Sequence, residues 1–86
     1  MIIADTSDRR VMDNRPEVDP KIELRYAGIP TPDSFSVVVI ETHSNGRCLS
    51  YNLYLPSNAE RLTVGRLQVD FKKISSHSCF VDYTLL

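Results

Sequence analysis

Two histidine and cysteine pairs are the side chains of this chain best suited to chemistry. His43 and Cys48 flank the turn Ser-Asn-Gly-Arg, and His77 and Cys79 lie in and just after a turn at residues 75 to 78. Imidazole and thiolate groups are common ligands of zinc, which needs four ligands at about 2.0 to 2.3 Å. In a meander of antiparallel strands these two turns lie at the same end of the sheet, so the four residues form a candidate Cys2His2 zinc site.

Three features argue against that site. The strand expected between the two pairs separates their host strands by two strand spacings, roughly 9 to 10 Å. The spacings His-x4-Cys and His-x-Cys are not those of familiar zinc modules. Cys79 also shares the alternation of Val81 and Leu85, which places it in the core, while His43 is expected at an exposed hairpin end. We therefore expect no metal and no cofactor, and keep a zinc-stabilised β-domain built on these four side chains as an alternative.

Nucleophilic catalysis has weak support in the sequence. Residues 75 to 79, Ser-Ser-His-Ser-Cys, place candidate nucleophiles beside a base, and Asp82 follows. Adjacent residues of a strand point to opposite faces, however, and no helix amino terminus is expected that could lower a thiol pKa. The chain has three glycines and none of the common nucleophile-elbow, zinc-protease or phosphate-loop motifs. We expect that the protein is not an enzyme.

The elements that must carry these residues are strands. Between residues 21 and 86 apolar and polar residues alternate with a period of two, which is typical of β-structure. Asn45-Gly46 favours a tight hairpin. The expected strands cover residues 21–26, 34–42, 48–55, 61–74 and 79–86. This pattern predicts an all-β domain of about five antiparallel strands in meander order, folded as a small barrel or a strongly bent sheet.

The alternation changes phase within the strand expected at 61–74. Apolar residues fall on even numbers up to Val64 and on odd numbers from Leu67. A β-bulge with Gly65 at its first position would restore the pattern within one bent strand. The alternative is a short turn at Gly65 that divides two strands.

Residues 1–20 differ from the domain at 21–86. They are polar, contain Pro16 and Pro20, and are expected to form an N-terminal arm, either flexible or with one short helix at residues 6–14. The first residues lack the apolar run of a secretory leader, and no stretch approaches the roughly 18 apolar residues of a membrane span. We expect a cytoplasmic protein whose two cysteines are reduced.

The charge balance does not favour nucleic acid. Ten Lys and Arg against eleven Asp and Glu give a net charge of -1, so the molecule has no field that attracts a polyanion. An OB-like binder of single strands, a further alternative, would need aromatic residues interleaved with basic ones on one face. Only Tyr54 and Phe80 fall outside the expected core, so nucleic acid is not the expected partner.

Four apolar residues remain on the side of the predicted sheet that otherwise carries Ser, Asn, Thr and charges. They are Val38, Ile40, Tyr54 and Phe80. A domain this small has little chain left to cover them, so either the N-terminal arm or another protein surface does so. We predict a protein interface at these four residues, and expect that a free edge at 22–26 or 79–86 could also pair across chains.

The predicted function follows from what remains after these exclusions. We expect a small, non-catalytic protein-binding module of the inhibitor, adaptor or viral or phage accessory type, acting through an apolar sheet face or an edge strand. Its partner is expected to be another protein or a second copy of the chain in a homodimer, and not a membrane.

Overall fold

The computed structural model describes residues 2–4, 9–13 and 15–86, and within them the chain forms strands and no helix. The strands are β1 (Ile2–Ala4), β2 (Arg9–Val11), β3 (Lys21–Tyr26), β4 (Ser34–Thr42), β5 (Cys48–Pro56), β6 (Arg61–Val64), β7 (Leu67–Ile74) and β8 (Ser78–Leu85). Each of the five predicted strand regions therefore carries at least one strand.

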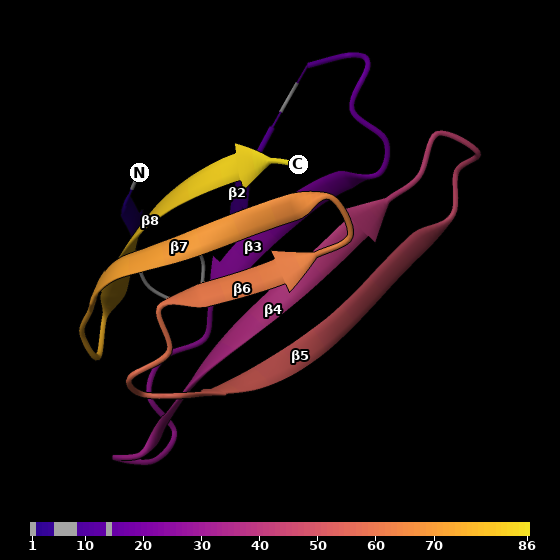
Figure 1. Ribbon diagram of the computed structural model, residues 1–86. Helices are drawn as coiled ribbons and strands as arrows, with labels where there is room; N and C mark the ends of the chain where they lie inside the picture. The colour runs from indigo at the N-terminus through magenta and orange to yellow at the C-terminus, as the bar shows by residue number, and fades with distance from the viewer. Residues whose placement is uncertain (1, 5–8, 14) are drawn as a thin grey trace.

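The strands form two antiparallel sheets that pack face to face (Figure 1). One has the order β2-β3-β4-β5 and the other β1-β8-β7-β6. Strands β3 to β5 and strands β6 to β8 each run as a meander, and the chain changes sheet at residues 57–60. The prediction of an all-β antiparallel meander is confirmed, with the strands shared between two sheets that do not close into a barrel.

A tight hairpin, and not a bulge, causes the change of phase at Gly65. Val64 pairs directly with Leu67, so Gly65 and Arg66 form a two-residue loop between β6 and β7. Gly65 has a φ of +59°, the left-handed conformation that such loops require. The bulge prediction was wrong and the turn alternative is correct. Because residues facing each other across a hairpin share a sheet face, a two-residue loop shifts the alternation just as one extra residue does.

The N-terminal arm contributes to both sheets. β1 pairs with β8, and β2 pairs with β3. The Met12 side chain is 1% exposed within the core, and its backbone N–H donates to the Ile22 carbonyl at 2.9 Å. The short helix considered for 6–14 is not formed at Arg9–Val11, which is strand, and residues 6–8 and 14 lie outside the described residues.

An aromatic contact joins the two sheets. The rings of Phe35 on β4 and Phe71 on β7 pack edge to face with centroids 5.2 Å apart. Tyr26 on β3 lies 6.3 Å from Phe35 by ring centroid, and its hydroxyl donates to the Ser75 carbonyl of the β7–β8 turn at 2.6 Å. This hydrogen bond satisfies a phenol that is 1% exposed, and it ties the first sheet to the end of the second.

Replacing Tyr26 by Phe tests this connection. The variant keeps the ring but leaves the half-buried Ser75 carbonyl without this donor, so we expect a loss of about 1 kcal/mol in the free energy of unfolding. Urea denaturation measures the difference. Tyr54→Phe is the matched control, because Tyr54 is 68% exposed, and it should leave stability unchanged. Equal urea midpoints for the two variants would contradict a stabilising role for the bond.

Candidate functional site

The four residues predicted to form an interface do not meet on one surface. Val38, Ile40 and Tyr54 share the outer face of the β2-β3-β4-β5 sheet, as their parity predicts. Phe80 lies on β8 in the other sheet. Its neighbours Cys79 and Val81 are buried, so Phe80 lies on the outer face of that sheet, on the other side of the molecule. The expectation of one shared surface is wrong, because alternation assigns a residue to a face but does not say which sheet its strand joins.

The outer-face residues also differ in exposure. Val38 is only 7% exposed, whereas Tyr54 is 68% exposed. Arg25 of β3 lies directly across from Val38, and the aliphatic part of an arginine side chain covers apolar neighbours in this position. Ile40 is half-buried between Glu23 and Ser50. Tyr54 is thus the one large apolar side chain of the three that is freely available on this face.

A larger uncovered surface lies on the inner face of β5. Its inward-pointing residues pair with the most deeply buried residues of β4: Tyr51 lies opposite Val39, Leu53 opposite Val37 and Leu55 opposite Phe35. The β4 residues are 0 to 2% exposed, while their β5 partners are half-buried and Leu49 is 38% exposed. The second sheet therefore covers the inner face of β4 fully and that of β5 only in part. We call the inner-facing residues Leu49, Tyr51, Leu53 and Leu55 the open flank.

Strand β5 is also the longest edge strand in the structure. Among the described residues it is hydrogen-bonded to β4 alone, and it runs for nine residues with a regular register. The other edge strands have three residues (β1 and β2) or four (β6). No charged residue occurs between Arg47 and Glu60. Short length, charges, bulges and prolines are the devices that protect edges from pairing, and β5 has only a proline at its last position, Pro56.

The direction of the free backbone groups follows from the two ends of the β4–β5 hairpin. His43 N–H donates to the Arg47 carbonyl at 2.8 Å, and Ser57 N–H donates to the Asp33 carbonyl at 2.9 Å. Hydrogen-bonded pairs alternate along an antiparallel ladder, so the odd-numbered residues of β5 bond to β4. The even-numbered residues Ser50, Asn52 and Tyr54 direct their N–H and C=O groups to the open edge.

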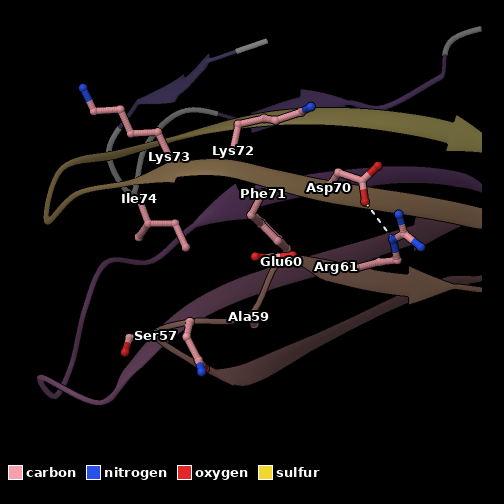
Figure 2. A pocket seen from close by; sticks show the side chains of 10 residues that line it. Ser57, Ala59, Glu60, Arg61, Asp70, Phe71, Lys72, Lys73 and Ile74 are labelled. Carbon is pink, nitrogen blue, oxygen red and sulfur yellow. Dashed lines mark hydrogen bonds and ion pairs between the residues drawn. The ribbon is translucent and has the colours of Figure 1, made fainter.

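A groove of about 860 Å³ adjoins the end of β5 (Figure 2). It lies between the β5–β6 connection and β7, next to the hydrogen bond from Phe71 N–H to the Glu60 carbonyl, which is 2.8 Å long. Figure 2 shows Phe71 and Ile74 pointing toward this connection and Lys72 and Lys73 pointing away. The floor of the groove is thus apolar, like the open flank.

The charges around this groove are largely paired with one another. Arg61 Nε lies 2.8 Å from Asp70 Oδ1, and Lys72 Nζ lies 3.6 Å from Asp82 Oδ2. The groove is lined by both exposed and buried side chains, and no nucleophile is paired with a base among its lining residues. This arrangement suits contact with a polypeptide surface better than enclosure of a small substrate.

A second cavity of about 230 Å³ lies between residues 13–22 and the ends of β6, β7 and β8. The acidic groups beside it are mostly engaged. Asp13 is 5% exposed and accepts a 2.6 Å ion-pair contact from Arg15. Asp19 accepts hydrogen bonds from the backbone N–H and the hydroxyl of Ser44, at 2.9 and 3.0 Å. The Asp19 contacts tie the end of the arm to the β4–β5 turn, whereas the Asp13–Arg15 pair is a local contact within the arm.

The two histidine and cysteine pairs lie at opposite ends of the molecule. The β4–β5 turn carries His43 and Cys48, and the β7–β8 turn carries His77 and Cys79 (Figure 1). The expectation that these turns share an end is wrong, because the hairpin at Gly65 adds one more reversal of the chain. Within the described residues no group of three or more His, Cys, Asp or Glu side chains could hold a metal ion. The four side chains therefore do not converge as the alternative zinc site requires.

The OB-like alternative also lacks its required arrangement. An OB-fold presents its aromatic residues on one face of a partly open barrel. Here the sheets do not close, and Tyr54 and Phe80 lie on different sheets.

In the described part of the chain, no helix has the length and apolar character to cross a membrane.

Comparison with protein-family models, with curated proteins and with solved structures gives no match for this chain. The geometry of the site is therefore the basis for any functional conclusion.

The β5 edge was missed by the sequence analysis, although a signal for it was present: residues 48–59 form the one long uncharged stretch between Arg47 and Glu60.

Thiol reactivity tests the placement of the two cysteines. Burial raises the pKa of the Cys79 thiol to about 11, whereas Cys48 is exposed. At about pH 8 only about one part in a thousand of a thiol with such a pKa is the reactive thiolate. We expect an aromatic disulfide reagent to titrate one thiol per native chain and two in denaturant. A Cys48→Ser variant should show no fast reaction, and rapid modification of Cys79 would contradict its burial.

Acid unfolding tests the contribution of the Asp13–Arg15 pair to stability. Hydrogen bonds from Arg15 hold the pKa of the Asp13 carboxyl below its ordinary value of 3.8. A lowered pKa in the folded state stabilises the fold above the ordinary value, and this contribution is lost as the pH falls through the lower folded value. We expect the wild type to be more stable than Asp13→Asn at neutral pH, with the difference shrinking below pH 3.8.

The matched control for this experiment is Glu17→Gln. Glu17 lies 4.0 Å from the same arginine but is 68% exposed, so its removal should change stability little at any pH. Urea midpoints measured from acid to neutral pH give both comparisons. A pH-independent difference between the wild type and Asp13→Asn would show that the charge of Asp13 is not what stabilises the arm.

Proposed function

We propose that this chain is a small, non-catalytic protein-binding module that docks through the free edge of β5 and the open flank beside it. The observation that carries the proposal is the combination on one strand of a long uncharged edge and a half-exposed apolar face. An extended segment added to such an edge gains affinity from main-chain hydrogen bonds and specificity from alternate side chains.

The two parts of the surface act on the same ligand. Backbone groups of Ser50, Asn52 and Tyr54 bond to the added segment, while its inward-pointing side chains extend the layer formed by the open flank. A strand in this position also covers apolar area that the second sheet leaves in contact with water. Binding thus completes the sandwich without any rearrangement of the core.

The setting that we propose is intracellular binding of the inhibitor, adaptor or accessory type. Cys48 and Cys79 are both free thiols, and an exposed free thiol such as Cys48 suits the reducing conditions of the cytoplasm. β5 itself offers hydrogen bonds and apolar contacts and has no charged side chain. The ligand class that fits it is therefore an extended polypeptide.

Selection from a library of random peptides on dilute immobilised protein tests this function. We expect the selected peptides to alternate apolar residues and to lose at least about tenfold in affinity for Asn52→Pro, which removes one N–H from the open edge. Proline is tolerated at this position because the lost donor faces away from β4. Fluorescence anisotropy with a labelled selected peptide measures the affinity.

Thr63→Pro is the matched control. The pairing of Leu62 with Val69 and of Val64 with Leu67, together with the bond from Phe71 to Glu60, places the Thr63 N–H on the free edge of β6. This variant should bind the peptides as the wild type does. Failure to select any peptide, or peptides whose binding ignores Asn52→Pro, would overturn the proposed function.

A further inference from the structure

The sequence of β5 makes the strand complementary to itself in the antiparallel direction. We infer that the segment that docks on β5 is β5 of a second copy, so that two β2-β3-β4-β5 sheets join across a two-fold axis at Asn52. This inference rests on the proposed function, because it names the partner of the same edge. Two-fold pairing of identical edges is a closed arrangement and leaves no free β5 edge for further growth.

The backbone permits this register. In an antiparallel pair related by a two-fold axis at Asn52, Ser50 lies opposite Tyr54 of the second copy, and Asn52 lies opposite itself. These are the even-numbered residues whose N–H and C=O groups point to the open edge, as the hydrogen bonds at both ends of the hairpin require. The register also overlaps the strand over its full length, with Cys48 opposite Pro56 at each end, where Pro56 has no N–H to donate.

The side chains match on both faces. On the inner face Leu49 lies opposite Leu55 of the second copy, and Tyr51 lies opposite Leu53, so the two open flanks become one apolar layer. On the outer face the Asn52 amides lie side by side, where each can donate to and accept from the other. Cross-strand pairs of aromatic and branched aliphatic residues are among the stabilising ones in sheets.

The charges around β5 are compatible with an identical partner. β5 itself has no charge, so self-pairing places no like charges opposite each other. The exposed charges that bound the strand have opposite signs, Arg47 before it and Glu60 after it. Antiparallel pairing brings the start of one strand to the end of the other, so each Arg47 lies toward Glu60 of the second copy. Arg61, beside Glu60, is already paired with Asp70 at 2.8 Å.

The other edge strands do not offer this arrangement. β1, β2 and β6 have only three or four residues, and β6 begins with Arg61. A two-fold pairing of so short a strand forms few hydrogen bonds and covers little apolar area. Within the described residues β5 is the edge on which two copies of the chain can bury a continuous surface.

Disulfide trapping tests the register. In a Cys48→Ser background, Asn52→Cys places two thiols on the axis at a Cα separation of about 5.5 Å, within the range of about 4.4 to 6.8 Å that a disulfide spans. The matched control Ser50→Cys places each new thiol about 14 Å from its copy, since four residues separate them along the strand. We expect covalent dimer from the first variant and little from the second under the same mild oxidation.

The oligomeric state of the unmodified chain completes the test. Light scattering after size exclusion should show a dimer that Asn52→Lys converts to monomer, because two ammonium groups then face each other on the axis. The control Thr63→Lys, on the free edge of β6, should remain dimeric. A wild type that is monomeric at all accessible concentrations, a dimer indifferent to Asn52→Lys, or equal trapping by the two cysteine variants would overturn the inference.

Failure of the dimer inference can be distinguished from failure of the proposed function. A monomeric wild type that binds selected peptides in an Asn52-dependent way would overturn the dimer and leave the protein-binding function intact. Absence of both peptide binding and dimer would overturn both.

Discussion

The packing of Phe35 against Phe71 is the contact on which the rest of the structure depends. It fixes the second sheet over β3 and β4, and the Tyr26 hydroxyl bonded to Ser75 holds the end of that sheet in place. A small chain has few strands with which to cover its own core. Once the second sheet is centred on these rings it covers Val37 and Val39 fully, and β5 remains half covered. The position of the open flank is therefore set by the aromatic contact.

Much of this fold could be predicted from the sequence. Period-two alternation located strands 21–26, 34–42 and 48–56 almost to the residue, because on a strand that is half buried the alternation directly reports the sheet face. Asn45-Gly46 identified the β4–β5 hairpin, and Gly46 adopts a φ of +88° there. These features depend on local chemistry alone, which is why a single sequence contains them.

Features that depend on the partner of a strand could not be predicted in the same way. A bulge and a two-residue hairpin at Gly65 produce the same change of parity, and the choice between them decides the direction of every strand that follows. The wrong choice placed the His77 turn beside His43, so one ambiguous glycine accounts for the error in the candidate metal site. The error in the predicted surface has another cause: the chain changes sheet at residues 57–60, which puts Phe80 on a different sheet from Val38.

The edges of the sheets show how the chain uses its N-terminal residues. The sequence predicts free edges at 22–26 and 79–86; in the structure β2 pairs with Glu23–Arg25 of the first and β1 with Ser78–Phe80 of the second. Short terminal strands protect the long strands beneath them from pairing with other molecules. No such protection is given to β5, where one lysine or proline in place of Asn52 would supply it at little cost to the ladder with β4. An uncharged, regular edge of this length is a hazard for a protein that must remain alone, and it is the feature required of one that binds an extended chain.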